Sequence, residues 1–494
     1  MSEQNTASFE ITDKEINAFV DEVWDDFLED ASRLIAIDSS LDSEHASERA
    51  PFGPGPRKAL DEILSIANRL GYETNDGDGY AGYADLPGET NQQLGVIGHV
   101  DVVPAGIGWT FEPFALTRKE GVLIGRGTAD DKVPLLSALY AGKFWLDRAK
   151  GQSDPTSHAP LHHAVRFIFG CNEETGMADV PYYRAHHNAP DFLFTPDADF
   201  PLCYGEKGLF GVTLTREISE DAVISFDGGV ATNAVPALAC AVVSVSPEEV
   251  SEALKSFTDA GRISFEVCSE GVRISATGVS GHASLPEGTV NAVAILARFL
   301  EGLPVCSAQE CEWFGWVAKL AESIDGSAAG IAVSDEDFGS LTSVVGTLHK
   351  EGSSYILTDD IRFPTAITGA ELERAFIELG DRLGASVEIT RNQEPFVVNP
   401  NTAPVQALMD AYKQSTGLEV HPFTMGGATY AREFPHAVSF GPADPEVIKG
   451  PDWVGEMHGA DEGVTEEAVK HAMRIYIRAF GNLAQVENLA LEKL

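Results

Sequence analysis

Roughly the first 200 residues of this chain alternate amphipathic helical patterns with short apolar runs, and this alternation restricts the folds open to it. The helical patterns place apolar residues on one side of each helix, and the apolar runs have the length of buried strands. Strands that alternate with helices form a largely parallel sheet with helices on both faces. We therefore predict an α/β fold with a mixed, largely parallel sheet. The expected helices cover residues 13–36, 56–70 and 135–149, and the expected strands cover residues 94–103, 165–169 and 192–194.

The pattern changes after about residue 206, where expected hairpins alternate with helices. Hairpins and helices in this order indicate an α+β domain with an antiparallel sheet. A chain of 494 residues is too long for one core, and the first pattern returns at about residue 397. We predict a first domain over residues 1–206 and 397–494, with an inserted domain over residues 207–396. The expected strands of the insert cover residues 209–218, 263–267, 272–277, 341–348, 355–363 and 386–390, and the later helices cover residues 247–260, 290–300, 371–383, 404–415 and 466–480.

The chain is strongly acidic, with 76 acidic against 34 basic residues and a formal net charge of -42. Nucleic acids and anionic membranes are bound by positive patches, so we expect neither as a partner. The most apolar long stretch, residues 228–245, contains Thr232, Asn233 and Pro236, and it predicts buried strands or helix rather than a membrane span. Residues 1–10 have no basic region and no apolar region, so no secretory signal is expected.

The cysteines indicate a reducing compartment. The six of them are scattered through the chain without a Cys-x-x-Cys motif, which does not suit a disulfide framework. A cytoplasmic location is therefore expected. Cys306 and Cys311 could form half of a zinc site, although buried, inert thiols are the more common arrangement.

Two adjacent glutamates, Glu173 and Glu174, follow the strand expected at residues 165–169. Like charges at a strand end repel each other, and burial makes it harder for either to ionise. A chain that keeps such a pair commonly has a cation to share or a proton to move. One carboxylate would then bind a metal while the other acts as a general base. An exposed acidic turn is the alternative explanation of the pair.

Further polar residues fall at or just past the ends of the expected strands, where ligands bind in sheets of this kind. They are His99, Asp101 and Asp197, in addition to the two glutamates. His99 and Asp101 are two residues apart on an expected strand, so their side chains share one face and can touch. A histidine that binds a metal commonly donates its other N–H to a carboxylate.

Each remaining pattern also has a plain structural explanation. An aspartate before the helix that begins near residue 134 is a frequent N-cap, although this does not explain both Asp130 and Asp131. Asp197 lies in a Pro-Asp turn, and His458 lies in a turn before the last helix. Taken jointly, two imidazoles and several carboxylates suffice for a pair of divalent ions. Mixed nitrogen and oxygen ligands suit Zn²⁺, Mn²⁺ or Co²⁺.

As an ordered set, five motifs resemble those of the M20 metallopeptidase family, and most closely its PepV-like (Sapep-like) dipeptidase branch. The resemblance runs from about residue 10 to the C-terminus, and it implies a zinc-exopeptidase type of α/β fold with an inserted α+β lid. Residues 1–206 and 397–494 would form the catalytic domain, and residues 207–396 the lid. The motifs are Gly98-His99-Val100-Asp101-Val102-Val103-Pro104, Gly125-Arg126-Gly127 with Asp130-Asp131-Lys132, Glu173-Glu174-Thr175-Gly176, Ser280-Gly281-His282-Ala283-Ser284 and His458-Gly459.

The resemblance implies two divalent metal ions, most commonly zinc, with manganese or cobalt as alternatives. Asp130 would bridge the two ions. His99 and Asp197 would complete one metal site, and Glu174 and His458 would complete the other. The family also has a cis peptide bond after the bridging aspartate.

The catalytic and substrate-binding roles are likewise implied by the resemblance. Glu173 would be the general base that takes a proton from a metal-bridged water and passes it to the leaving amine. Asp101 would orient His99. In the lid, His282 would stabilise the oxyanion. The residues that hold the substrate's carbonyl, its C-terminal carboxylate and its backbone would be Asn233, Arg362, Gly426 and Gly427. Without the resemblance, His282 could be a turn residue and Arg362 a surface ion pair.

Two positions depart from the family pattern, with Val133 where glycine is usual and Asn172 where aspartate is common. Neither departure removes an expected metal ligand. The size of the lid implies a monomer that supplies His282 from its own chain. We therefore expect a metal-dependent dipeptidase that acts on unblocked dipeptides. The alternatives are a deacylase of N-acyl or N-succinyl amino acids in the same family and a non-catalytic metal- or peptide-binding relative, which the presence of Glu173 disfavours.

Overall fold

The computed structural model describes residues 11–151, 161–219 and 222–490. The absence of a secretory signal, which we expected from residues 1–10, therefore concerns residues outside the described ranges. The chain divides into two compact units. Unit 1 consists of Met1–Gly205, Val397–Phe423 and Ala428–Leu494, and unit 2 consists of Glu206–Phe396 and Thr424–Gly427. The predicted second segment of the first domain, residues 397–494, includes residues 424–427, whereas the structure groups these four residues with unit 2.

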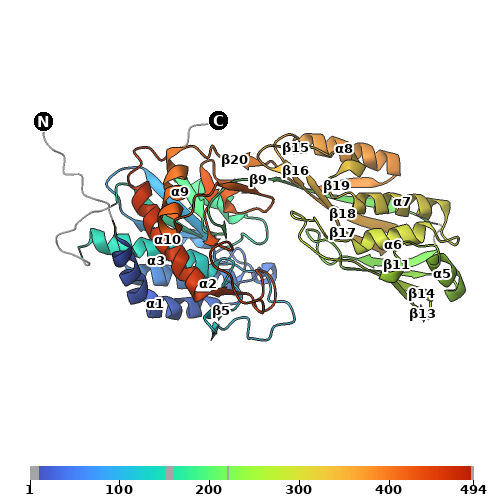
Figure 1. The fold of residues 1–494 in the computed structure, drawn as a ribbon, viewed down its shortest axis with the longest axis horizontal. Helices are drawn as coiled ribbons and strands as arrows, with labels where there is room; N and C mark the ends of the chain where they lie inside the picture. Colours follow the sequence, from blue (N-terminus) through green and yellow to red (C-terminus); the bar gives the residue numbers. More distant parts are fainter. Residues whose placement is uncertain (1–10, 152–160, 220–221, 491–494) are drawn as a thin grey trace. The chain divides into compact units, whose positions relative to one another are not determined.

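Unit 1 is built on a nine-stranded sheet with the strand order β1-β2-β6-β3-β7-β22-β9-β20, in which β21 also pairs with β9. Figure 1 labels β9 and β20 of this sheet. The four strands β6, β3, β7 and β22 are mutually parallel, while β2 runs antiparallel to β6 and β9 runs antiparallel to β22. The prediction of a mixed α/β sheet is thereby confirmed. The strand bounds are β1 Glu73–Asn75, β2 Ala81–Leu86, β3 Gln93–His99, β6 Ala164–Gly170, β7 Phe192–Thr195, β9 Cys203–Glu206, β20 Phe396–Val397, β21 Phe423–Met425 and β22 Ala437–Ser439.

The helices of unit 1 follow from local sequence signals. A capping box between Thr12 and Glu15 starts the first helix, and Gly71 in the left-handed conformation ends the second. The third helix is buried over most of its length, because the first and last helices pack against it. The bounds are α1 Asp13–Ile35, α2 Pro54–Leu70, α3 Lys132–Ala149, α4 Asp179–His186, α9 Ala403–Thr416 and α10 Glu466–Leu483.

Three small pairings complete unit 1. A three-stranded sheet of β4, β5 and β24 joins the region before α3 to the region before α10, and β8 pairs with β23. The bounds are β4 Thr117–Lys119, β5 Val122–Ile124, β8 Ala198–Asp199, β23 Pro442–Ala443 and β24 Gly463–Thr465.

The strand that we expected over residues 94–103 is shorter, since β3 ends at His99. Beyond this point the chain leaves the sheet for a loop, where Ser39 Oγ donates to Val100 O at 2.6 Å and Val102 N donates to Ser39 O at 3.3 Å. Asp101 therefore does not lie on the strand as expected, although its Oδ1 still comes within 3.5 Å of His99 Nδ1, so the expected contact between the two side chains is present.

Unit 2 contains an eight-stranded antiparallel sheet with the order β13-β14-β12-β11-β17-β18-β10-β19. Both hairpins expected from the sequence are present, as β13 with β14 and β17 with β18. The bounds are β10 Gly208–Glu217, β11 Val223–Gly228, β12 Leu238–Val243, β13 Ile263–Cys268, β14 Gly271–Thr277, β17 Thr342–Glu351, β18 Ser354–Phe363 and β19 Ser386–Gln393, with a separate small pair of β15 Ser334–Asp335 and β16 Gly339–Ser340.

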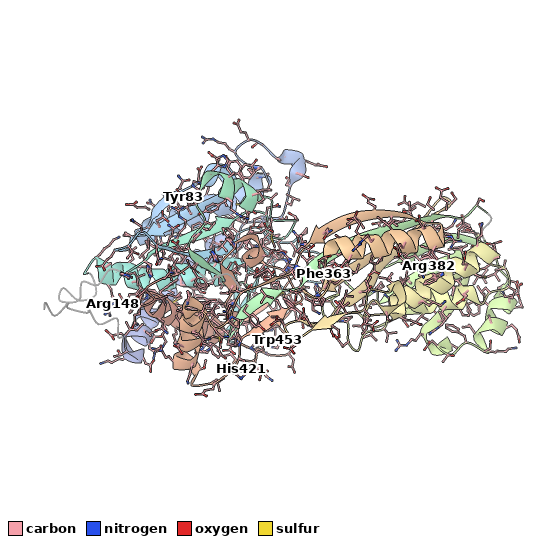
Figure 2. The ribbon with its side chains drawn as sticks, turned by 90° about the horizontal axis from the view of Figure 1, so that it is seen from above. Tyr83, Arg148, Phe363, Arg382, His421 and Trp453 are labelled. Atoms are coloured by element: carbon pink, nitrogen blue, oxygen red, sulfur yellow. The ribbon has the colours of Figure 1, made fainter. Side chains whose placement is uncertain are left out.

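Four helices share the apolar core of unit 2 with this sheet. Phe363, the last residue of β18, is fully buried in that core. Figure 2 labels this residue. We expected no helix at α7, although Ser307 and Glu310 form a capping box at its start. α5 ends at Leu254, before the expected end at residue 260. The bounds are α5 Pro247–Leu254, α6 Ala292–Glu301, α7 Ala308–Glu322 and α8 Gly369–Leu383.

Two expectations about the whole chain can be compared with the structure. Within the three described ranges, none of the helices combines the length and the apolar character that a membrane span requires. The six cysteines all lie in these ranges, and all are free thiols. Burial raises the pKa of the Cys306 thiol to about 12, which disfavours the thiolate that a zinc half-site with Cys311 would need.

Candidate metal centre

The parallel strands of unit 1 bring their carboxyl ends to one edge of the sheet. His99, the last residue of β3, is in register with Gly170, the last residue of β6. Residues that follow these strands therefore meet beyond the same edge, although they are far apart in the sequence. Glu173 and Glu174 follow β6, and Asp197 follows β7.

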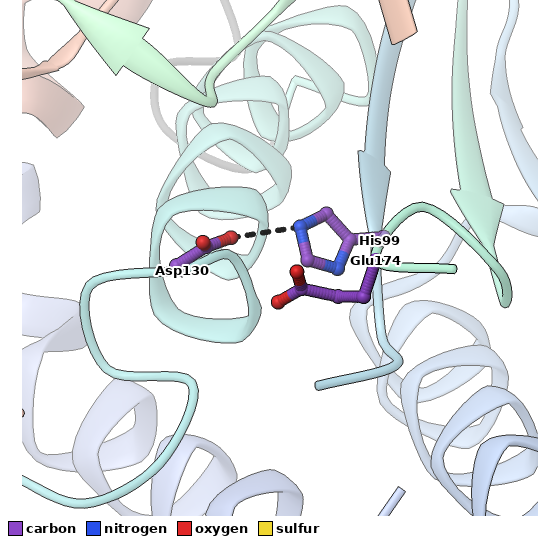
Figure 3. Close-up of side chains that lie close together, drawn as sticks. All are labelled: His99, Asp130 and Glu174. Atoms are coloured by element: carbon purple, nitrogen blue, oxygen red, sulfur yellow. Dashed lines mark hydrogen bonds and ion pairs between the residues drawn. The ribbon is translucent and has the colours of Figure 1, made fainter. Parts of the chain in front are cut away.

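Asp130 lies between two imidazoles. Its Oδ1 is 2.8 Å from His99 Nε2 (Figure 3), and its Oδ2 is 2.8 Å from His458 Nε2. His458 Nε2 is also 3.2 Å from Glu174 Oε2, and His99 Nε2 is 3.9 Å from Asp197 Oδ2. The structure thus brings all five expected metal ligands together around one carboxylate that faces both histidines.

Neither Asp130 nor its neighbour Asp131 acts as a side-chain cap of α3. Asp131 occupies the N-cap position, but its carboxylate makes no capping hydrogen bond, and its Oδ2 instead accepts from His99 N at 3.1 Å. The Asp130-Asp131 peptide bond is cis, as expected for the bond after the bridging aspartate. The capping explanation of these two residues is therefore wrong, and both carboxylates belong to the cluster at the sheet edge.

Asp101 holds the backbone of the glutamate pair. Its Oδ1 accepts from Glu173 N and its Oδ2 accepts from Glu174 N, each at 3.2 Å. The nearest atom of Asp101 to the His99 ring is the backbone oxygen, at 2.9 Å from Nδ1, whereas its carboxylate is 3.5 Å away. The Asp101 carboxylate therefore lies beside the His99 ring and also holds the turn that carries the glutamates, so its role in orienting His99 stays a prediction.

The carboxylates of the cluster are hard to ionise without a positive neighbour. Burial raises the pKa of Glu173 well above its ordinary value, and the charges of Asp197 and Glu174 raise it further. Burial and the charge of Asp130 likewise raise the pKa values of Glu174 and Asp197. Within this part of the chain, the negative charges therefore require compensation by a cation or by protons.

The histidines show the opposite effect. Hydrogen bonds to Asp130 and Glu174 raise the pKa of His458 to about 11. Burial lowers the pKa of His99, but its contacts with Asp101 and Asp130 outweigh burial and raise it well above the ordinary value. Burial also opposes ionisation of Asp130, yet hydrogen bonds with His458 and His99 lower its pKa. Each imidazole therefore favours its protonated form, and the proton supplies positive charge at the place where a bound metal ion would supply it.

The donor set fits a divalent metal ion. One ligand atom each of His99, Asp130 and Glu174 lies within 4.8 Å of the others. Glu174 Oε1 is buried, and no described residue donates a hydrogen bond to it. A buried carboxylate oxygen without a donor is unfavourable, and a cation would satisfy it. The His458 side chain is 50% exposed whereas that of His99 is fully buried, so the cluster is accessible from the His458 side.

In unit 2, the structure brings the expected substrate-binding residues together in two pairs. Ala283 N donates to Asn233 O at 2.9 Å, so the backbone places the exposed residues His282 and Asn233 on adjacent segments. The His282 ring lies 2.7 Å, through Nδ1, from Ser284 Oγ. The side chains of His282 and Asn233 therefore belong to the same part of unit 2.

The second pair joins Arg362 of β18 to the glycine-rich segment. Arg362 binds the Asp360 carboxylate through two nitrogens and donates to Gly426 O at 3.2 Å, with Gly427 next in the chain. Arg362 is only 4% exposed, so its ion pair with Asp360 is buried. The alternative of a surface ion pair is therefore wrong.

Sequence reasoning missed three buried residues around the cluster. Glu462 and Arg126 form an ion pair, and Asp179 accepts from Cys171 N and Asn172 N at the turn before the glutamates. Glu462 comes four residues after His458, in the turn before the last helix, and this position was a usable signal. Asp179 had no signal of this kind, because its partners are backbone N–H groups and the hydroxyl of Tyr430, which lies 251 positions later in the chain.

Comparisons with known proteins find similar sequences over most of this chain. The model of the family described as Peptidase family M20/M25/M40 matches residues 95–482. The Beta-Ala-Xaa dipeptidase of Lactobacillus delbrueckii subsp. lactis is 34% identical over 477 residues, which cover 94% of this chain and 97% of that protein. A putative dipeptidase of Staphylococcus aureus (strain MW2) is 31% identical over 485 residues, which cover 95% of this chain and 99% of that protein.

Solved structures show the same fold at lower identity. Human carnosine dipeptidase 1 superposes with a TM-score of 0.58 and 14% identity, covering 96% of this chain and 100% of that chain. The di-peptidase Dug1p from Saccharomyces cerevisiae superposes with a TM-score of 0.56 and 14% identity, covering 96% of this chain and 99% of that chain.

Proposed function

Since this chain belongs to peptidase family M20/M25/M40 and is a peptidase that uses divalent metal, we propose that it hydrolyses the peptide bond of unblocked dipeptides. One observation carries this proposal. Asp130 faces two imidazoles in a cluster of buried carboxylates, and Glu174 Oε1 has no donor among the described residues. The choice of substrate is supported by relatives that match this chain over nearly their full length and are named as dipeptidases.

Two divalent ions, most commonly zinc with manganese or cobalt as alternatives, would bind in this cluster. Asp130 would contact both ions, His99 and Asp197 would hold one, and Glu174 and His458 would hold the other. Ions bound there polarise a carbonyl group and lower the pKa of a water molecule.

Glu173 is suited to act as the general base. No described residue donates a hydrogen bond to its carboxylate, while Asp101 holds its backbone N–H. Burial raises its pKa well above the ordinary value, and a carboxylate with a raised pKa is a stronger proton acceptor. Glu173 would take a proton from the attacking water and pass it to the leaving amine. Asp101 would support this role by fixing the turn that carries both glutamates.

Unit 2 would bind the dipeptide itself. The Arg362 guanidinium is held by Asp360 and Gly426 O, and a guanidinium in a fixed orientation suits bidentate binding of a substrate carboxylate. His282 would stabilise the oxyanion and Asn233 would hold the carbonyl. The backbone of Gly426 and Gly427 would contact the peptide. We further propose that the protein acts as a monomer in the cytoplasm, without nucleic acid or membrane as a partner.

A substrate panel tests the function. Purified protein is treated with EDTA, dialysed, reloaded with zinc, manganese or cobalt, and assayed on dipeptides, tripeptides and N-acyl amino acids. We expect cleavage of dipeptides with free amino termini, loss of activity after EDTA, and recovery on reloading. Cleavage of N-acyl or N-succinyl amino acids without cleavage of dipeptides would instead establish the deacylase. Metal binding without any hydrolysis would indicate a non-catalytic relative.

A further inference from the structure

A buried ion pair beside the metal centre has no part in the proposed chemistry. Arg126 follows β5 and Glu462 precedes β24, and these two strands pair with each other. The Arg126 side chain is 1% exposed, the Glu462 side chain is 0% exposed, and Arg126 Nη1 binds Glu462 Oε2. Removing two charges from water is costly, and replacing such pairs by apolar residues often leaves stability unchanged. Stability alone therefore gives a weak reason for this pair.

Glu462 gathers the backbone that leads to Asp130. Its Oε1 accepts from Gly127 N at 3.0 Å, from Ala129 N at 2.9 Å and from Asp130 N at 3.3 Å. Its backbone oxygen also accepts from Thr128 Oγ1 at 3.2 Å. The position of Asp130 is therefore set by a carboxylate that comes from the His458 loop.

Arg126 binds the backbone of the other segments that carry ligands. Its Nη2 donates to His458 O at 3.1 Å, and also to Pro104 O at 3.4 Å and Ala105 O at 3.3 Å in the segment that follows His99. His458 has a φ of 64°, which residues other than glycine rarely adopt. The hydrogen bond to its carbonyl holds the residue in this conformation.

We propose that Arg126 and Glu462 form a positioning pair that sets the spacing between Asp130 and His458, and so determines the metal affinity of the site that these residues would form with Glu174. This inference rests on the proposed function only in assuming that metal binds there. Neither side chain would touch metal or substrate. The pair acts because it ties three ligand-carrying segments to one rigid, fully buried contact. Loss of outer groups that orient metal ligands typically lowers metal affinity about 10–100-fold.

Two variants separate the parts of the pair. Glu462→Gln keeps the shape and one acceptor oxygen, but it removes the charge and places an amide against Arg126. Arg126→Lys keeps the charge pair, but it loses the planar fork that reaches the three backbone carbonyls. The matched control is Asp30→Asn, because Asp30 is 1% exposed and binds Arg69 and Tyr140 in the same unit, among helices away from the centre.

Each protein is stripped of metal, its thermal unfolding is followed by circular dichroism, and it is titrated with Zn²⁺ against a chromophoric chelator and with Co²⁺ by visible absorption. We expect Glu462→Gln and Arg126→Lys to weaken one of the two bound ions about 10–100-fold and to change the Co²⁺ spectrum. Asp30→Asn should lower the unfolding temperature but leave metal affinity within about twofold of wild type, because Asp30 contacts no ligand segment.

Metal affinities equal to that of the Asp30→Asn control would overturn the proposal. If Glu462→Gln does not fold, the metal affinity of Arg126→Lys tests the proposal, since that variant retains both charges. If neither folds while the control does, the pair is a folding element and the positioning role is rejected. The titrations use no substrate, so a wild-type protein that binds two ions without cleaving dipeptides refutes the proposed function and leaves the positioning role intact. A wild-type protein that binds no divalent ion refutes both.

Discussion

The polar residues singled out in unit 1 and those singled out in unit 2 differ in how their charges are compensated. In unit 1, buried carboxylates face one another, and Glu174 Oε1 has no donor among the described residues. In unit 2, Arg362 is paired with Asp360, and His282 lies beside Ser284. The first arrangement is unfavourable without cations. The second is stable as it stands and suits recognition of a substrate by hydrogen bonds. The comparison predicts that substitutions in unit 1 act on metal content and chemistry, whereas those in unit 2 act on substrate affinity.

The largest effect is expected for Asp130→Asn. The amide has the shape of the carboxylate, but it cannot supply negative charge to both imidazoles and to two ions. We expect metal content to fall below one ion per chain and kcat/KM to fall at least about 10⁴-fold, since the ions and the ordered water are lost together. Metal content by inductively coupled plasma mass spectrometry and steady-state kinetics check this. A variant that retained two ions would show that the carboxylate is not shared.

Glu173→Gln should retain the metal while losing the chemistry. Its side chain is assigned to proton transfer only, so the ions should remain and kcat should fall about 10²–10⁴-fold. The Asp130→Asn protein is the natural comparison, because it loses metal as well. Unchanged turnover in the Glu173 variant would end the general-base assignment.

Arg362→Lys tests the assignment in unit 2. A lysine keeps the positive charge but cannot bind a carboxylate through two parallel hydrogen bonds. The loss of a hydrogen bond to a charged group weakens binding about 10–100-fold. This loss should appear as a rise in KM more than as a fall in kcat. Metal content should equal that of the wild type. A fall in metal content without a rise in KM would place Arg362 with the residues of unit 1 and break the comparison.

The smallest effect on activity is expected from Asp359→Asn, which should instead change how stability depends on pH. Asp359 is 2% exposed in unit 2, Ser343 Oγ donates to both of its oxygens at 3.1 Å, and burial raises its pKa to about 7. The unfolded value is about 3.9, so the folded state holds this proton more tightly. Its contribution to stability is fully present below about pH 4 and is lost as pH rises toward 7.

Denaturant unfolding of wild type and Asp359→Asn at several pH values between 4 and 8 measures this contribution. We expect the difference between the two proteins to change by about 2–4 kcal/mol across that range, with the variant gaining relative stability as pH rises. Activity at neutral pH should stay close to that of the wild type. Parallel pH profiles for the two proteins would show that Asp359 does not hold a proton in the folded state.

Much of the local structure was predictable because its causes lie within a few residues. Gly71 ends α2 in the left-handed conformation, and β13 and β14 form the hairpin expected around Glu270-Gly271. The errors have non-local causes. β3 stops at His99 because the following residues pair with Ser39, which lies about 60 positions earlier in the chain. The missing prediction of α7 is the exception, because the capping box of Ser307 and Glu310 at its start is a local signal.

For the metal centre, the sequence alone determined which residue types are present and in what order, because ligand chemistry belongs to the side chains themselves. It indicated His99, Asp130, Glu173, Glu174 and His458 without any contact between them. The tertiary structure decided the contacts. Asp130 lies between two imidazoles, Asp101 holds the glutamate turn by its carboxylate, and Glu462 joins the Asp130 segment to the His458 loop. The physical reason is the parallel register of β3, β6 and β7, which brings distant strand ends to one edge, and no local pattern encodes which atoms then meet.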